Sequence, residues 1–263
     1  MSRISLTHLR KLQNKGEKIT CLTAYDTSFA RLIDQAGVEI ILIGDSLGMV
    51  IQGHDSTLPV TIDDMIYHAQ MVHRGTERSF LIVDMPFMSY ATPDAALKNA
   101  ARLMREGQVQ MVKLEGGAWL ADTIQLLTQR GIPVCAHLGL TPQSVHQLGG
   151  YRIQGRNENE AEQLREDALA LQTAGASLLV LECVPKQLAV EIRDELLIPV
   201  IGIGAGAECD GQVLVLYDIL GITPEPIPSF AKNFLTGSIK EAIEAYVVAV
   251  KAGEFPDETH CFK

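Results

Sequence analysis

The sequence predicts an α/β protein, a parallel (β/α)₈ barrel of the TIM type with an extra helix before the first strand. Three observations predict this fold. The chain has 263 residues, close to the roughly 250 of one such barrel, although length alone would also allow two small domains. Eight short apolar runs alternate with helical segments, which indicates repeated βαβ units. Each run is continuously apolar, as expected for strands buried on both faces.

The eight predicted strands belong to repeats of roughly 30 residues. Repeats of this size close a barrel more readily than they build an open sheet, so an open doubly wound sheet is the alternative. We therefore expect a single barrel domain over residues 1–263. In chain order, the strands are predicted at Ile19–Ala24, Val38–Ile43, Phe80–Val83, Met111–Leu114, Val134–Ala136, Leu178–Leu181, Val200–Ile203 and Val213–Leu216.

Signals for the start and end of helices lie between these runs. Thr61–Asp64 has the form of a capping box before the apolar-periodic segment Met65–Val72. Thr92 and Thr141 each precede a proline that suits the first turn of a helix. Left-handed residues that end helices are predicted just before strands, at Gly37, Gly107, Gly131 and Gly175.

Two further helices are expected outside the eight repeats. Residues Ser5–Asn14 precede the first strand, and we expect this helix to plug the bottom of the barrel. Residues Gly237–Ala252 show the spacing of a late amphipathic helix and are followed by a polar tail.

The composition is that of an ordinary globular protein. Hydrophobic residues make up 47% of the chain and charged residues 21%, which is ample material for a large core. The formal net charge is −10. An acidic surface argues against nucleic acid as the main partner, because phosphate binding needs clustered Lys and Arg.

The sequence also indicates a cytoplasmic protein with no membrane partner. Residues 1–5 lack the apolar segment of a signal peptide, and no apolar run approaches the roughly 18 residues of a membrane span. The five cysteines are widely spaced and form no CxxC pair, which disfavours a disulfide framework or a structural zinc site.

Several apolar runs end in a polar residue that a packed core would exclude. In a barrel these positions lie at the C-terminal mouth, where catalytic groups collect. A single Asp after a strand is often the N-cap of the next helix, but five coincident cases favour a functional site. The residues are Asp45 with Ser46, Asp84, Lys113 with Glu115, His137, and Glu182.

The carboxylates among them suit a hard cation such as Mg²⁺, which takes one or two carboxylates and completes its shell with water and substrate. Asp45 and Asp84 are the candidate direct ligands, and Glu115 binds directly or through a water. Lys113 and Glu115 are two apart on a strand, so both face the interior. The alternative for this pair is an internal ion pair that only stabilises.

Two other features have more than one interpretation. His137 is expected to bind substrate as a general acid or hydrogen-bond partner, or to be a histidine satisfied within the mouth. Residues Gly202–Gly206 form a Gly-rich segment after the seventh strand, where barrels often bind phosphate. The segment lacks full GxGxxG spacing, so a tight turn that admits substrate is an equal alternative.

At these residues the chain resembles the ketopantoate hydroxymethyltransferase family, and the resemblance extends from about Ile19 to the tail. The long stretch from GDSLGM to DSTLPVT is highly specific. The matching segments are TAYD (23–26), GDSLGM (44–49), QGHDSTLPVT (52–61), DMPFMSYATP (84–93), VKLEGG (112–117), HLGLTPQSV (137–145), LECVP (181–185), PVIGIGAG (199–206) and FAKNF (230–234).

The resemblance implies a barrel of the phosphoenolpyruvate/pyruvate type and a Mg²⁺-dependent, aldol-type transfer of one carbon. The hydroxymethyl group would pass from 5,10-methylenetetrahydrofolate to 3-methyl-2-oxobutanoate, giving 2-dehydropantoate and tetrahydrofolate in pantothenate biosynthesis. The family forms large homo-oligomers, so a homodecamer is expected.

The resemblance also implies a role for each matching residue. Asp45 and Asp84 bind the metal, and Glu115 belongs to the metal site. The ketoacid contacts Asp45, Ser46, Asp84 and Lys113, while Glu182 accepts the proton. These roles agree with elementary chemistry, because a chelated 2-oxoacid loses a neighbouring proton more readily and a carboxylate at a dry mouth can act as the base.

Two alternative functions are also compatible with these residues. The first is a related barrel enzyme, such as a phosphonopyruvate mutase or lyase, which uses the same metal chemistry on another oxoacid without folate. The second is a non-catalytic binding protein with a barrel fold, for which Asp45 and Asp84 are dispensable.

Overall fold

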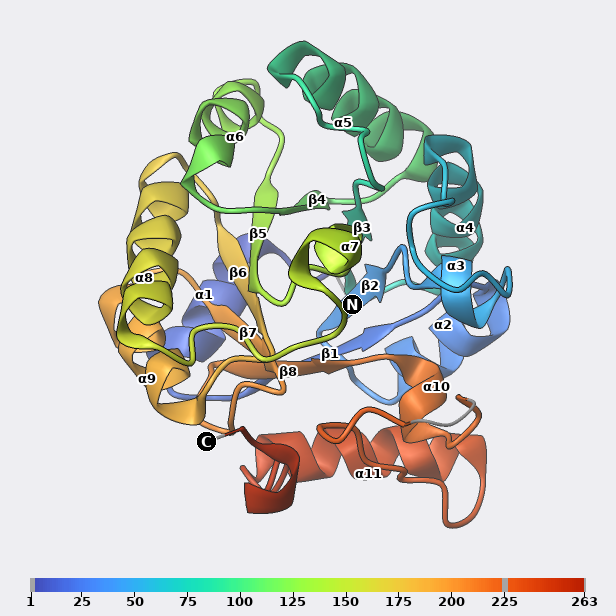
Figure 1. Cartoon of the computed structure of the whole chain (residues 1–263). Helices are drawn as coiled ribbons and strands as arrows, with labels where there is room; N and C mark the ends of the chain where they lie inside the picture. Colours follow the sequence, from blue (N-terminus) through green and yellow to red (C-terminus); the bar gives the residue numbers. More distant parts are fainter. Residues whose placement is uncertain (1–2, 224–226, 263) are drawn as a thin grey trace.

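The computed structural model describes residues 3–223 and 227–262. Eight parallel strands follow one another around a closed barrel, and β8 pairs with β1 (Figure 1). This confirms the predicted fold class and rules out the open sheet. Met1, Ser2 and Lys263, at the ends of the predicted domain, lie outside the described residues. The strands are β1 Ile19–Thr23, β2 Ile40–Ile43, β3 Phe80–Asp84, β4 Met111–Glu115, β5 Val134–Gly139, β6 Leu178–Glu182, β7 Val200–Ile203 and β8 Gly211–Leu214.

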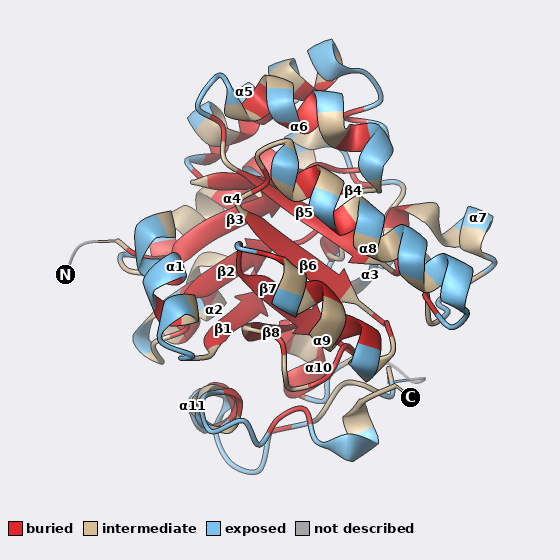
Figure 2. Cartoon of the chain, turned by 90° about the vertical axis from the view of Figure 1, so that its left-hand side faces the viewer, coloured by how far each residue is buried: buried red, intermediate tan, exposed pale blue. Residues whose placement is uncertain are grey.

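Helices surround the barrel and bury one face each, whereas the strands are buried almost throughout (Figure 2). In the part of the chain that the structure describes, no helix is long and apolar enough to span a bilayer. The helices are α1 Leu6–Asn14, α2 Thr27–Gln35, α3 Leu47–Val50, α4 Ile62–Gly75, α5 Pro93–Gly107, α6 Ala121–Thr128, α7 Val145–Leu148, α8 Glu158–Thr173, α9 Lys186–Glu195, α10 Leu216–Ile219 and α11 Ile239–Lys251, with the 3₁₀ turns η1 Ala118–Leu120, η2 Pro142–Ser144 and η3 Glu258–His260.

Seven predicted strands coincide with observed ones to within a few residues, and the eighth is displaced. The prediction of Val213–Leu216 was wrong at both ends, because β8 is Gly211–Leu214 and Leu216 begins α10. A short apolar run does not distinguish a strand from a buried helical turn. The strand begins at a glycine because its backbone approaches β1 closely: a Cβ on Gly211 would lie 2.3 Å from the carbonyl oxygen of Ile19.

The helix signals are confirmed in part. Thr61 caps α4 in a capping box with Asp64, and Thr92 caps α5. Thr141 takes the N-cap position before Pro142, as predicted, but its side chain makes no cap hydrogen bond and a 3₁₀ turn follows in place of an α-helix.

Of the four predicted left-handed glycines, Gly37, Gly131 and Gly175 have positive φ. Gly107 does not, because it closes α5 and the left-handed position falls to Gln108, with φ of 57°. A Cβ on Gly107 would lie 3.0 Å from that of Ala69, so the glycine permits the close contact between α4 and α5.

The predicted extra helix is α1, which lies at the end of the barrel opposite α7 (Figures 1 and 2). Its Leu9 side chain is fully buried, and Gln13 Nε2 donates to Asp210 Oδ2 at 3.2 Å. The expected late helix is α11, which starts at a capping box formed by Ser238 and Glu241. The closed bottom leaves the opposite mouth as the end where a site is expected.

Asp34, near the end of α2, fixes the turn before β3. Its Oδ1 accepts hydrogen bonds from the backbone N–H groups of Arg78 and Ser79 at 3.1 and 2.6 Å, and its Oδ2 accepts from Glu77 at 3.1 Å. Partial burial raises the pKa of Asp34, but hydrogen bonds from Ser79, Glu77 and Arg78 outweigh burial and hold the pKa below its ordinary value.

We expect Asp34→Asn to lower the free energy of unfolding by about 1–2 kcal/mol near pH 7. Because the folded pKa is depressed, this stabilisation is fully present above the unfolded-state pKa of roughly 3.9 and is lost as the pH falls through the folded value. Urea unfolding of wild type and variant over a descending pH series measures it, with the exposed Asp55→Asn as control. A stability difference that does not shrink in acid would contradict this role.

Candidate active site

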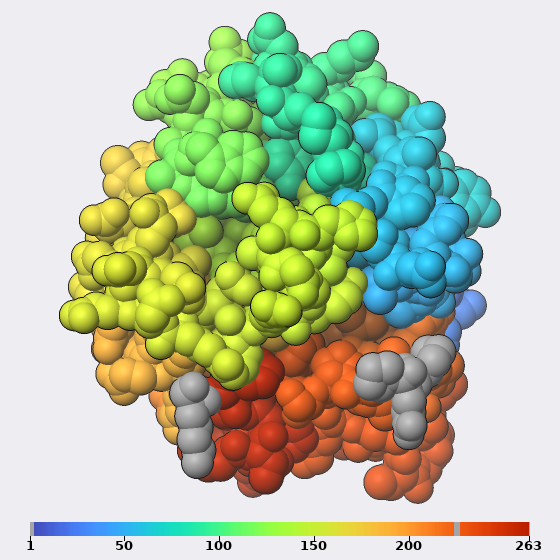
Figure 3. All heavy atoms as spheres, in the orientation of Figure 1, coloured from blue at the N-terminus to red at the C-terminus, as the bar shows by residue number. Residues whose placement is uncertain are grey.

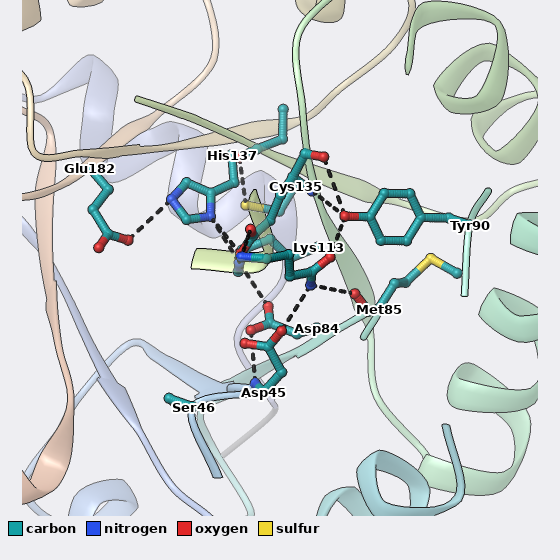
Figure 4. Close-up of polar contacts among 12 residues, drawn as sticks. Asp45, Ser46, Asp84, Met85, Tyr90, Lys113, Cys135, His137 and Glu182 are labelled. Atoms are coloured by element: carbon teal, nitrogen blue, oxygen red, sulfur yellow. Dashed lines mark hydrogen bonds and ion pairs between the residues drawn. The ribbon is translucent and has the colours of Figure 1, made fainter. Parts of the chain in front are cut away.

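The register of the barrel gathers the predicted polar residues at its mouth. Asp84 on β3 pairs with Lys113 on β4, and Glu115 on β4 pairs with His137 on β5. Glu182 ends β6 opposite Gly139 of β5. Residues paired in register project to the same face of a sheet, so these side chains converge inside the mouth (Figure 4).

Asp84 forms the centre of the cluster on the β2 side. Its Oδ2 accepts a hydrogen bond from the backbone N–H of Asp45 at 3.0 Å, and its Oδ1 forms an ion pair with Lys113 Nζ at 3.0 Å. Ser46 follows Asp45, and its hydroxyl lies 2.8 Å from that of Tyr25. The short helix α3 begins directly after these residues, yet Ser46 makes no cap hydrogen bond, so its hydroxyl is held by Tyr25 at the mouth.

A second group joins Glu115 to Glu182 through His137. Lys113 Nζ is 3.5 Å from Glu115 Oε1 and 3.1 Å from His137 Nδ1. His137 Nδ1 is 3.3 Å from Glu115 Oε1, and its Nε2 is 3.2 Å from Glu182 Oε2. The Glu182 side chain is 13% exposed, against 2% for Glu115. Glu182 is therefore the more solvent-accessible of these two carboxylates.

The carboxylates of the mouth repel one another. Burial, followed by the charges of Asp84 and Glu115, raises the pKa of Asp45 well above its ordinary value. Burial lowers the pKa of Lys113, but the charges of Asp84, Glu115 and Asp45 outweigh burial and raise it, so the ammonium stays charged. Burial raises the pKa of Glu115, whereas Lys113 and His137 lower it further than burial raises it.

His137 is suited to hold Glu182. Burial and the Lys113 charge lower the pKa of His137, but the carboxylates of Glu115 and Glu182 raise it by more. With Nδ1 accepting from Lys113, or with both nitrogens protonated, Nε2 carries a proton that faces Glu182. The structure shows His137 as a buried histidine between two carboxylates of the mouth, Glu115 and Glu182. Its predicted contact with substrate stays a prediction.

Two buried polar atoms of the cluster lack a well-aligned hydrogen bond, namely Asp84 Oδ1 and His137 Nε2. Asp84 Oδ1 accepts no aligned hydrogen bond beyond its ion pair with Lys113, and together with the repelled Asp45 carboxylate it offers the hard oxygen donors that Mg²⁺ prefers. Within residues 3–223 and 227–262, no three His, Cys, Asp or Glu side chains form a ready-made coordination sphere. The oxygens of Glu115 contact Lys113, His137 and the backbone N–H of Gln143.

Sequence reasoning missed Gln143 and Tyr90. Gln143 Nε2 donates to Asp45 Oδ2 at 2.8 Å, and its Oε1 accepts from the Tyr90 hydroxyl at 2.5 Å. Both residues lie in segments that the family resemblance covers. Gln143 directly follows Thr141-Pro142, a pair that predicted the start of a helix and no functional residue. Tyr90 follows no apolar run, so the strand-end rule does not select it.

The loop after β5 covers the middle of the mouth, where α7 lies over the barrel (Figures 1 and 3). Tyr151 in this loop donates a hydrogen bond to Met49 Sδ at 3.4 Å, across to the loop after β2. Burial, with the charges of Glu182, Asp45 and Glu115, raises the pKa of Tyr151. Tyr151 is therefore within reach of the charges of the cluster, and no pattern in the sequence singled it out.

The Gly-rich segment after β7 is a tight turn. Gly204 and Gly206 have positive φ, and a Cβ on Gly204 would lie 3.0 Å from the Phe262 ring and 3.1 Å from the Phe230 ring. Aromatic rings from the chain itself pack against the turn, which favours a tight turn over a phosphate-binding loop.

Solved structures of similar fold define the class. Phosphoenolpyruvate phosphomutase from Streptomyces platensis subsp. rosaceus superposes with a TM-score of 0.63 at 14% identity, covering 83% of each chain. A 2,3-dimethylmalate lyase, described as a member of the PEP mutase/isocitrate lyase superfamily, gives a TM-score of 0.58 at 22% identity over 80% of each chain. The fold is thus the closed (β/α)₈ barrel that these structures share, here with a cluster of carboxylates at the mouth.

The sequence comparison narrows the class to one family. The profile described as Ketopantoate hydroxymethyltransferase matches residues 3–258, and the chain belongs to this family. A 3-methyl-2-oxobutanoate hydroxymethyltransferase from Nitrosococcus oceani is 63% identical over 258 residues, 97% of this chain and 98% of the relative. One from Tolumonas auensis is 59% identical over 264 residues, 100% of both chains. The protein is therefore an enzyme, a hydroxymethyltransferase, and the predicted resemblance is confirmed.

Proposed function

We propose that this enzyme transfers a hydroxymethyl group from 5,10-methylenetetrahydrofolate to 3-methyl-2-oxobutanoate, giving 2-dehydropantoate and tetrahydrofolate in pantothenate biosynthesis. The names of the relatives support the ketoacid. The observation that carries the chemistry is the convergence at the mouth of Asp45, Asp84, Lys113, Glu115, His137 and Glu182. A cation, a fixed ammonium and a separate, partly exposed carboxylate are what enolisation of a 2-oxoacid requires.

Asp45 and Asp84 would hold Mg²⁺, and Glu115 would support the site through Lys113 and the surrounding hydrogen bonds. When bound, the ion polarises the keto group of the substrate and stabilises negative charge that develops on its oxygen. Ser46 and Lys113 are proposed to contact the ketoacid, together with the two aspartates. Lys113 already lies between Asp84 and Glu115, so its charge is fixed in place before the substrate arrives.

Glu182 is proposed as the base that takes the proton from carbon 3 of the ketoacid. The separation of its carboxylate from the aspartates leaves it free to accept a proton, and His137 orients it at 3.2 Å. One water hydrolyses the methylene bridge of the folate: both C–N bonds break, the two nitrogens take up the protons, and the carbon is released as formaldehyde. The electron pair left at carbon 3 attacks this carbon, and the resulting alkoxide takes up a proton to become the hydroxyl group of the product. Because His137 contacts both Glu115 and Glu182, it is a positioning residue and a route for the returning proton.

Deuterium exchange at carbon 3 of 3-methyl-2-oxobutanoate tests the proposal. With Mg²⁺ we expect deuterium exchange at carbon 3 even without folate, and formation of 2-dehydropantoate only when methylenetetrahydrofolate is added. Both reactions are monitored by proton NMR. No exchange in either mixture would sink the proposed function. Cleavage of a phosphonopyruvate or another oxoacid would favour a related mutase or lyase, and ligand binding that survives loss of Asp45 and Asp84 would favour a non-catalytic protein.

Other parts of the hypothesis rest on the family alone. The homodecamer stays a prediction of this kind, and the cytoplasmic location stays a prediction from the sequence. Sedimentation velocity of the purified protein tests the first of these, since a decamer of 28.7 kDa chains separates clearly from a dimer.

A further inference from the structure

A buried glutamine connects three strand-end segments of the mouth. Gln143 lies in the η2 turn after β5 and is 6% exposed. Its Nε2 donates to Asp45 Oδ2 at 2.8 Å and to the backbone carbonyl of Met85 at 2.9 Å, while its Oε1 accepts from Tyr90. We propose that Gln143, oriented by Tyr90, is the positioning residue that aims the Asp45 carboxylate at the divalent cation and the ketoacid. The inference rests on the proposed function.

The surrounding groups allow only one orientation of the amide. Asp45 Oδ2 and the Met85 carbonyl only accept hydrogen bonds, so they require the NH₂ end of Gln143. The Tyr90 hydroxyl then donates to Oε1 at 2.5 Å, its shortest contact, since its contacts with the Glu115 backbone are 3.3 and 3.4 Å. If the amide were flipped, Oε1 would face two other acceptors, Asp45 Oδ2 and the Met85 carbonyl oxygen, and both hydrogen bonds would be lost. The two acceptors therefore fix which end of Gln143 faces the aspartate, and Tyr90 holds the opposite end of the amide in place.

Fixing Asp45 matters because its neighbours push it away. Asp84 and Glu115 are both acidic and both close to it, and only Lys113 among the cluster carries a permanent positive charge. A donor fixed on Oδ2 keeps the carboxylate from rotating, while Oδ1 makes no contact with Gln143. The backbone N–H of Gln143 also donates to Glu115 Oε2 at 3.0 Å, so one turn restrains two of the three predicted metal-site carboxylates.

A purely structural amide makes different contacts. Gln212 on β8 is also buried, at 2% exposed, and its Nε2 donates to the backbone carbonyl of Gly206 at 2.9 Å. Gln143 also donates to a backbone carbonyl, that of Met85, but its second N–H donates to the carboxylate of Asp45, a predicted metal ligand. Gln212→Met is therefore a matched control for the loss of a buried glutamine amide.

The test compares the full-length variants Gln143→Met, Tyr90→Phe, the double variant, and Gln212→Met. Mn²⁺ affinity is measured by electron paramagnetic resonance without ketoacid, and exchange at carbon 3 gives kcat and KM. We expect Gln143→Met to weaken Mn²⁺ binding and lower kcat by about 10–100-fold, the range seen for residues that orient metal ligands. Tyr90→Phe should lose less. The double variant should be no worse than Gln143→Met alone, because both residues act through one contact.

Gln212→Met is expected to lower the melting temperature while Mn²⁺ affinity stays within about threefold of wild type. If Gln143→Met lowers only the melting temperature and keeps wild-type Mn²⁺ affinity, the role is structural and the inference is overturned. Tyr90→Phe, which removes a single oxygen, decides the question if Gln143→Met does not fold. Mn²⁺ binding by a wild type that catalyses no exchange would refute the proposed function and leave the positioning test intact, whereas absence of Mn²⁺ binding would refute the inference.

Discussion

Asp84→Asn is expected to reduce Mg²⁺-dependent exchange at carbon 3 of 3-methyl-2-oxobutanoate by at least about 10³-fold, the upper range for loss of one electrostatic contact in an active site. The amide keeps the size of the side chain and can still accept from the Asp45 N–H. It removes the negative charge on Oδ1, the buried oxygen without an aligned hydrogen bond. Divalent ion affinity, by calorimetry, should fall together with exchange.

The fold of Asp84→Asn should survive, because the side chain lies in the mouth and Lys113 keeps Glu115 at 3.5 Å. Removing one partner of a buried pair still costs about 3–5 kcal/mol, so circular dichroism and a melting curve must accompany the assay. Asp34→Asn is the control, since it loses a hydrogen-bonded carboxylate at the other end of the barrel. A folded Asp84→Asn with near wild-type exchange and ion affinity would refute its assignment as a metal ligand.

Glu182→Gln is expected to reduce exchange at carbon 3 by about 10²–10⁴-fold, the usual contribution of a general base. Ketoacid and Mg²⁺ affinities should change little, because Asp45, Asp84 and Lys113 lie on the other side of His137 (Figure 4). The amide remains next to His137 but cannot accept the substrate proton. Exchange kinetics and a separate titration of the ketoacid therefore distinguish the base from a binding group.

Glu195→Gln provides the matched control for this carboxylate, since Glu195 pairs with Arg165 on the outer surface. Unchanged exchange in Glu182→Gln would rule Glu182 out as the base. Loss of ketoacid binding in parallel with exchange would instead assign Glu182 to substrate binding.

Much of the barrel can be predicted from the sequence because strand burial is a local property. β7 coincides with its predicted bounds at Val200–Ile203, since a parallel strand covered on both faces must be continuously apolar. Helix starts with a side-chain cap are local too, as at Thr61. The failures at Val213–Leu216 and Gly107 have a different origin: contacts with β1 and α4 decided them, and neither neighbour is adjacent in sequence.

The same distinction applies to the site. Polar residues at the ends of apolar runs located Asp45, Asp84, Lys113, Glu115, His137 and Glu182, because the ends of parallel strands meet at one mouth. The partners of each residue depend on barrel register, which sets Glu115 beside His137.

The sequence by itself determined the barrel, its mouth and the charged residues there, because each follows from burial and strand period within a few residues. Only the tertiary structure decided how that charge is held. Gln143 reaches Asp45 across 98 positions of chain, and the Tyr90 hydroxyl bonds the other end of its amide from a third loop. Such contacts depend on where closure of the barrel brings the loops, and no local pattern of residues encodes that position.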